Sequence, residues 1–107
     1  MVGWPAMGAS KLPPEVIRVI EAAEVLWSDH AGENADDMDL YWEDVAHAAR
    51  KATWWKREVD DKHEAIDGWK DSFEGRDCCG RKVYVAGKQV YFQGERHWYV
   101  VTIHEAR

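Results

Sequence analysis

The last third of the chain, residues 69–105, alternates apolar and polar side chains between glycine-centred turns. This pattern is typical of antiparallel β-strands that are joined by hairpins. Two segments with helical spacing precede it, and helices followed by strands give an α+β order rather than repeated βαβ units. The sequence therefore predicts an α+β fold in which two N-terminal helices pack on a four-stranded antiparallel sheet.

The length of 107 residues indicates one domain, which we place at residues 13–107. Residues 1–12 mix small residues with proline and predict a flexible tail. No apolar run approaches the ~20 residues of a membrane span, and the N-terminus lacks the pattern of a secretory signal. We therefore expect a cytoplasmic protein with no membrane association.

Proline at position 14 and a stripe of apolar residues at helical spacing, from Val16 to His30, predict a first helix that ends between Gly32 and Asp36. A second helix is expected from Leu40 to Lys51, with acidic residues in its first turn and basic residues in its last. The two helices should cover one face of the sheet.

Four strands are expected near residues 53–59, 69–74, 81–92 and 97–104, with Gly87 either ending the third or forming a bulge in it. The last strand is apolar on both faces. Simple alternation gives two sets of side chains: Trp98, Val100 and Thr102 on one face, and Tyr99, Val101 and Ile103 on the other. A strand of this kind needs cover on both sides, so we expect the helices on one side and a second subunit of a homo-oligomer on the other.

The formal charge is uneven. Residues 1–53 carry 4 Lys/Arg and 10 Asp/Glu, whereas residues 54–107 carry 10 of each. A net charge of −6 argues against non-specific nucleic-acid binding, which depends on neutralising phosphates. No basic recognition helix for specific DNA is present either. The sheet half is balanced and can still present a local basic face.

Two adjacent cysteines, Cys78 and Cys79, follow a strand, and adjacent cysteines rarely bridge because the geometry of a disulfide strains the peptide between them. They lack the spacing of a zinc site, and no phosphate-binding loop or nucleophile elbow occurs. We therefore expect reduced cysteines, no metal site and no cofactor.

Seven tryptophans are more than one core of this size needs, because each aromatic ring already buries a large apolar area. Some should lie in a groove or at a subunit contact, where tryptophan is enriched. Four are candidates for a ligand-binding or interface role, with core packing as the alternative: Trp42, Trp54, Trp55 and Trp98.

Four short motifs follow one another along residues 28–104. They are Ser28-Asp29-His30-Ala31, Trp42-Glu43-Asp44-Val45, Glu74-Gly75-Arg76-Asp77 with Gly80-Arg81, and Val100-Val101-Thr102-Ile103. In this order they resemble a family of small bacterial domains with a His-Ala near the first helix, a Gly-Arg-Asp…Gly-Arg hairpin and a terminal Val-Val-Thr-Val strand. That family is in turn similar to RelE- and BrnT-like toxins of toxin–antitoxin systems.

The resemblance implies the RelE/BrnT-like fold, a ribonuclease activity, and RNA or an antitoxin protein as partner. It carries a catalytic role to His30 as acid or base and to Arg76 and Arg81 as phosphate-binding groups. The alternatives are a histidine packed at a helix end and a solvated turn in which Asp77 pairs with one arginine.

The chain departs from the family pattern after His30, because the stretch from Gly32 to Asp37 contains no arginine. Cations there would stabilise the charge that develops on the scissile phosphate. Two functions therefore remain open: a toxin-like endoribonuclease fold that has kept or lost its activity, and a non-enzymatic oligomeric module with a tryptophan-rich interface or pocket.

Overall fold

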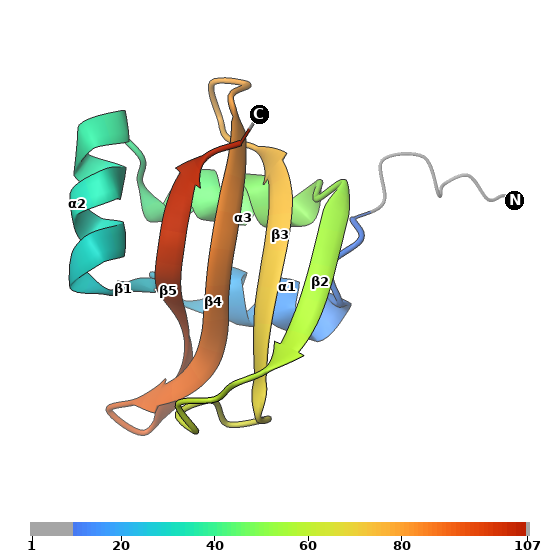
Figure 1. Cartoon of the computed structure of the whole chain (residues 1–107), viewed down its shortest axis with the longest axis vertical. Helices are drawn as coiled ribbons and strands as arrows, with labels where there is room; N and C mark the ends of the chain where they lie inside the picture. Colours follow the sequence, from blue (N-terminus) through green and yellow to red (C-terminus); the bar gives the residue numbers. More distant parts are fainter. Residues whose placement is uncertain (1–9, 107) are drawn as a thin grey trace, which may run out of the picture.

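The computed structural model describes residues 10–106, and this part of the chain is an α+β fold with three helices and a five-stranded mixed sheet (Figure 1). The expected α+β class is confirmed, whereas the expected two helices and four antiparallel strands are each one element short. In chain order the elements are α1 (Pro14–Ala22), β1 (Leu26–Trp27), α2 (Asp29–Met38), α3 (Trp42–Arg50), β2 (Trp54–Val59), β3 (Trp69–Arg76), β4 (Lys82–Phe92) and β5 (Glu95–Glu105).

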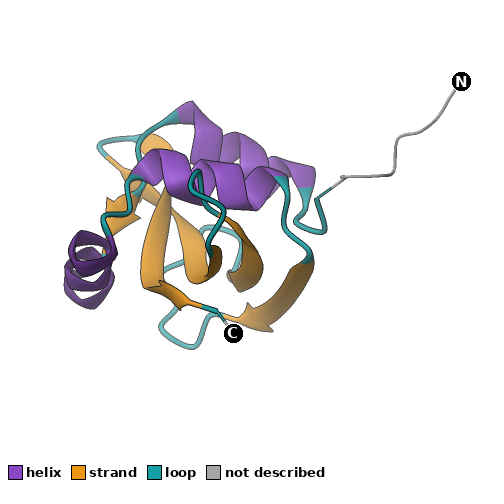
Figure 2. Ribbon diagram, turned by 90° about the horizontal axis from the view of Figure 1, so that it is seen from above, coloured by secondary structure: helices purple, strands orange, loops and turns teal. Residues whose placement is uncertain are grey.

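The strands lie in the order β1-β5-β4-β3-β2. β1 pairs parallel with β5, and every other neighbouring pair is antiparallel. Helices α1 and α3 lie across one face of the sheet, and α2 stands at the edge beyond β5 (Figures 1 and 2). No described helix packs on the opposite face, which we call the uncovered face.

The first helix is much shorter than the apolar stripe predicts. It ends at Ala22 because Ala23 is extended, with φ −155° and ψ 158°. The next apolar residues, Leu26 and Trp27, pair with β5 instead of continuing the helix. Ser28 then begins α2, since its side-chain oxygen accepts a hydrogen bond from the backbone N–H of Ala31. A serine before an acidic residue is an N-cap signal that the apolar periodicity conceals.

A bulge changes the phase of the last strand. The register between β4 and β5 shifts between Ala86 and Gly87. Gly87 does not end β4, which continues to Phe92, and the bulge lies in β5 opposite Gly87 rather than in β4 as expected. Val101 is the extra residue, and beyond it the side chains change faces. Ile103 therefore joins Trp98 and Val100 in the core, each with no exposed surface, and the prediction that Ile103 faces away from them is wrong.

The core lies between the sheet and the two covering helices, and α3 approaches the sheet closely. A Cβ atom on Gly75 of β3 would lie 2.2 Å from the carbonyl oxygen of Ala48. Small residues on α3 allow this contact, because Ala48 and Ala49 are fully buried between the helix and the strands. The sheet side of the core is dominated by Phe73 and Trp98, whose rings lie 6.5 Å apart.

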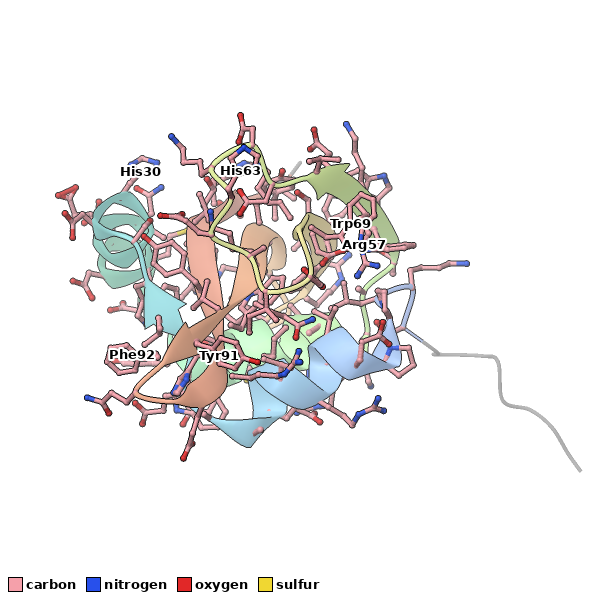
Figure 3. All side chains as sticks on the ribbon, turned by 90° about the horizontal axis from the view of Figure 1, so that it is seen from below. His30, Arg57, His63, Trp69, Tyr91 and Phe92 are labelled. Carbon is pink, nitrogen blue, oxygen red and sulfur yellow. The ribbon has the colours of Figure 1, made fainter. Side chains whose placement is uncertain are left out.

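The loop from β2 to β3, residues 60–68, folds back over one end of the uncovered face (Figure 3). The backbone N–H of Ile66 donates to the carbonyl oxygen of Gln89, and Lys88 of β4 is buried beneath the loop. Part of the second cover that β5 was expected to need is therefore supplied by the same chain. The other end of the face remains open.

The predicted tail, residues 1–12, falls largely outside the described residues, as does Trp4. Its last part is bound to the domain. The backbone N–H of Lys11 donates to the carbonyl oxygen of Ala52, and Leu12 is 2% exposed and belongs to the core. None of the described helices has the length and apolar character required to cross a membrane.

Candidate functional site

Four side chains form one row across the open end of the uncovered face. Tyr84 of β4 lies directly opposite Glu74 of β3 and His104 of β5, and Glu74 lies opposite Trp54 of β2. Residues that are paired in this way point to the same face of a sheet. The row Trp54–Glu74–Tyr84–His104 therefore crosses four strands, and we call it the cross-strand row.

The row presents stacked aromatic rings. The rings of Tyr84 and His104 are stacked with centroids 4.8 Å apart and an interplanar angle of 16°. Trp54 lies on the other side of Tyr84 at 6.2 Å and is 40% exposed. The hydroxyl of Tyr84 donates to Ser72 Oγ at 3.1 Å, which fixes the ring in place. A fixed aromatic surface of this kind suits the stacking of an unpaired base.

The stacked histidine is held with one nitrogen free. His104 is exposed, and its Nδ1 lies 2.9 Å from the backbone carbonyl oxygen of Glu105. A carbonyl oxygen can only accept, so Nδ1 carries the hydrogen and Nε2 is left to exchange a proton with solvent or a ligand. Nε2 is the atom through which His104 could act as an acid or a base.

The Glu74 carboxylate lies in the row on the side of Tyr84 opposite His104, and an ammonium group lies beside it. Lys82 Nζ lies 3.4 Å from Glu74 Oε1. One further cation at this end of the face, Arg76, forms no ion pair with any residue of the described range 10–106. The open end of the face therefore presents Lys82 and Arg76 beside the carboxylate of Glu74, although the whole chain carries −6.

His30 lies beside this face but outside the row. It is in the first turn of α2, on the side that points away from α1 (Figure 3). Its Nε2 lies 3.4 Å from the side-chain amide nitrogen of Asn34, which donates to the backbone oxygen of Ile103. His30 is thus linked through Asn34 to the residue that precedes His104.

The three residues expected to catalyse together are not brought into one cluster. Arg76 is on β3, two strand positions or about 10 Å from β5, and α2 with His30 lies beyond β5. Arg81 is held elsewhere, because its Nε donates to Asp77 Oδ2 at 2.8 Å and its Nη2 donates to the Met38 carbonyl at 2.7 Å. That carbonyl ends α2, whereas His30 begins it. Arg76 hydrogen-bonds Gly80 O across the hairpin and lies next to the cross-strand row.

The four candidate tryptophans occupy different environments. Trp98 is fully buried, and its indole N–H has no hydrogen-bond partner within residues 10–106. Trp55 packs on the covered face and donates to Asp71 Oδ1 at 2.9 Å, and Trp42 is half-buried at the start of α3. Only Trp54 belongs to the cross-strand row.

Sequence reasoning assigned no functional role to Glu74, Tyr84 or His104. Alternation along a strand shows which neighbours share a face, but it does not show which residues of two strands are opposite each other. The bulge at Val101 sets the register that brings His104 beside Tyr84. In the sequence, this register is signalled by Gly87, a glycine inside a strand pattern, which lies opposite the bulge.

Within residues 10–106 no three His, Cys, Asp or Glu side chains gather as a metal site. Cys78 and Cys79 are free thiols at the surface. Burial and the neighbouring carboxylate of Asp44 raise the pKa of Cys78 above its ordinary value. The chain matches no family model, and neither the curated proteins nor the solved structures include a match to it.

Proposed function

We propose that the protein is a toxin-like endoribonuclease that binds single-stranded RNA on the open end of its uncovered face. The cross-strand row is the observation that carries this proposal. It combines a stacked aromatic surface with a carboxylate and a histidine on opposite sides of the Tyr84 ring. Unpaired bases stack on such surfaces whatever their sequence.

RNA cleavage without a metal ion needs one group that accepts a proton and another that donates one. In our proposal Glu74 takes the proton of a ribose 2′-hydroxyl, whose oxygen attacks the adjacent phosphorus. The bond from phosphorus to the 5′-oxygen breaks, and the His104 imidazolium, which carries a proton on both ring nitrogens, gives that oxygen its Nε2 proton. The products are a 2′,3′-cyclic phosphate and a 5′-hydroxyl end.

The spacing of these two groups supports the assignment. Glu74 and His104 lie two strands apart, about 10 Å between Cα atoms, with the Tyr84 ring between them. Attacking and leaving oxygens lie on opposite sides of the phosphorus, so an acid and a base on opposite sides of a bound phosphate suit this reaction. Lys82 and Arg76 are placed to offset the charge that develops on the phosphate.

The proposal is tested with purified protein and a fluorescent single-stranded RNA in a metal-chelating buffer. We expect wild-type protein to give 2′,3′-cyclic phosphate ends. His104→Ala and Glu74→Gln should each slow cleavage about 10²-fold or more. His97→Ala is the matched control, because His97 lies on the same strand and face but at the far end, edge-on to Phe92.

Binding is measured separately from cleavage. Trp54→Ala should weaken RNA binding by about 1–3 kcal/mol, the usual contribution of one base stack. RNA binding that depends on Trp54, without any cleavage, would assign the protein to the catalytically degenerate class. Absence of RNA binding by wild-type protein would overturn the proposal altogether. Growth arrest on expression, tested with and without His30→Ala and His104→Ala, shows which histidine matters in the cell.

One observation favours a second candidate, a non-enzymatic binding module. A hollow of about 610 Å³ lies at the other end of the uncovered face, and its apolar lining includes Leu26, Ile66, Val90 and Tyr99. At its rim Tyr91 is 63% and Phe92 44% exposed (Figure 3). An apolar dye that binds here and is lost with Tyr99→Glu, together with no RNA binding, would favour this function over the first.

A further inference from the structure

We propose that two copies of the chain pair through the outer edges of their β2 strands, with Arg57 of one copy opposite Arg57 of the other. Within residues 10–106, β2 is the last strand on its side of the sheet, and only β3 pairs with it (Figure 1). This inference rests on the edge of β2 and is independent of the cross-strand row and its chemistry.

The hydrogen bonds of β2 show which backbone groups are free. The N–H of Asp60 donates to the carbonyl oxygen of Gly68, so Asp60 and Gly68 form a hydrogen-bonded pair of the antiparallel ladder. Bonded pairs alternate along an antiparallel ladder, and β2 and β3 remain in register from Trp54 to Val59. The N–H and C=O groups of Trp55, Arg57 and Val59 therefore point away from β3, and no residue of the range 10–106 hydrogen-bonds to them.

An antiparallel pairing about Arg57 uses all of these groups. Arg57 lies opposite Arg57 of the second copy. Trp55 lies opposite Val59 of the second copy at one end of the ladder, and the symmetric pair lies at the other end. Each of these opposed pairs is a bonded one, so the pairing forms about six backbone hydrogen bonds. No other register about a two-fold axis uses the three residues so completely.

The side chains of β2 are complementary in this register. Lys56 faces Glu58 of the second copy on one face of the joined sheet, and the reverse pair forms by symmetry. On the other face Val59, which is 67% exposed, packs against Trp55 of the second copy. Opposite charges and aromatic with β-branched residues are favourable cross-strand pairs. The same strand read in the parallel direction would place like charges together.

The two opposed arginines do not repel strongly, because each is held by its own sheet. The Arg57 guanidinium donates to both carboxylate oxygens of Asp71, which is 1% exposed. It also lies 5.5 Å from the ring centre of Trp55 and 5.6 Å from that of Trp69. Its charge is therefore paired and directed along the covered face rather than across the edge (Figure 3).

Sedimentation over a wide range of concentration tests the pairing. We expect a reversible dimer, with the amides of residues 55, 57 and 59 exchanging hydrogen more slowly as the dimer forms. Val59→Pro removes one outward N–H and leaves the bonds to β3 intact, so it should abolish the dimer while circular dichroism shows a folded chain. Val59→Thr keeps that N–H and should still form the dimer.

A charge exchange tests the register without touching the backbone. Lys56→Glu and Glu58→Lys should each weaken the dimer about tenfold, since two attractive pairs become repulsive. The double variant K56E/E58K should restore the wild-type affinity. A wild-type monomer at every concentration, a dimer that survives Val59→Pro, or a double variant as weak as the single ones would overturn the proposal.

Discussion

Lys88 Nζ lies 3.1 Å from Asp60 Oδ1, and both side chains are almost completely buried under the loop of residues 60–68. The ammonium group also lies 2.6 Å from Glu64 Oε1, at the surface of the same loop. Burial alone would lower the pKa of Lys88, but its hydrogen bonds to Glu64 and Asp60 outweigh burial and raise it. This ion pair fastens the loop to the centre of the sheet.

Lys88→Met should destabilise the protein by about 3 kcal/mol, because Asp60 would stay buried without its cation. The free energy of unfolding in urea measures this loss. Glu64→Gln is the control. The Glu64 side chain is 58% exposed, so removing its charge should cost less than about 1 kcal/mol. Equal losses in the two variants would show that Asp60 does not need Lys88.

Stability should also depend on the ionisation of Asp60. Burial by itself would raise the pKa of this carboxyl, but backbone N–H groups of the loop and the Lys88 ammonium lower it from 3.8 to about 2. A lowered pKa stabilises the fold above 3.8, and this contribution disappears as the pH falls through about 2. The stability difference between wild type and Asp60→Asn should therefore shrink from about pH 5 to about pH 2. Asp61→Asn, at an exposed site of the same loop, is the control variant.

Two glycine substitutions should have opposite effects. Gly75→Ala places a methyl group 2.2 Å from the backbone oxygen of Ala48 and should cost about 3 kcal/mol or more, since α3 must move. In Gly32→Ala the methyl group meets only Trp27 Cβ at 3.7 Å, an ordinary contact. Inside α2 this change should stabilise the protein by up to about 1 kcal/mol. Thermal unfolding of the two variants, followed by circular dichroism, provides the comparison.

Asp44 joins the start of α3 to the β3–β4 turn. Its two carboxylate oxygens accept from the backbone N–H groups of Tyr41 and Cys78, at 3.0 and 2.9 Å. Burial opposes the charge, but these hydrogen bonds lower the pKa of Asp44 below its ordinary value. Asp44→Ala should cost about 2 kcal/mol in chemical unfolding. Glu43→Ala, one residue earlier and exposed, should change stability by less than about 0.5 kcal/mol.

The long apolar stripe after Pro14 shows why the sequence predicted too few elements. The apolar residues in this stripe are spaced as one long helix requires, but a short strand followed by a second helix can carry the same spacing. Tertiary contacts decide which of the two structures forms. Two residues, Leu26 and Trp27, gain backbone pairing with β5, and Ser28 caps a new helix. The β-branched and aromatic strands from Trp54 onwards were predicted correctly, because their preference for extended structure agrees with their pairing.

The candidate site was less predictable than the strands that form it. Tyr84 and His104 are 20 positions apart in sequence, and only the hairpin register brings their rings into a stack. The resemblance implied a catalytic role for His30, but His30 lies on α2, beside the uncovered face and outside the cross-strand row. Side chains that meet across strands depend on where the ladder slips, and a single bulge at Val101 decides that here.

The parallel pairing of β1 with β5 also bears on how the chain folds as it is synthesised. Ser28 Oγ donates to the carbonyl oxygen of Val101, 73 residues later. Among residues 10–106, α2 packs on the sheet edge formed by β5 and β1, so we expect it to dock only once β5 has been synthesised. Contacts so distant in sequence slow folding. We therefore expect this domain to complete its fold only once β5 has been synthesised, because β5 is the strand that fixes β1 and α2.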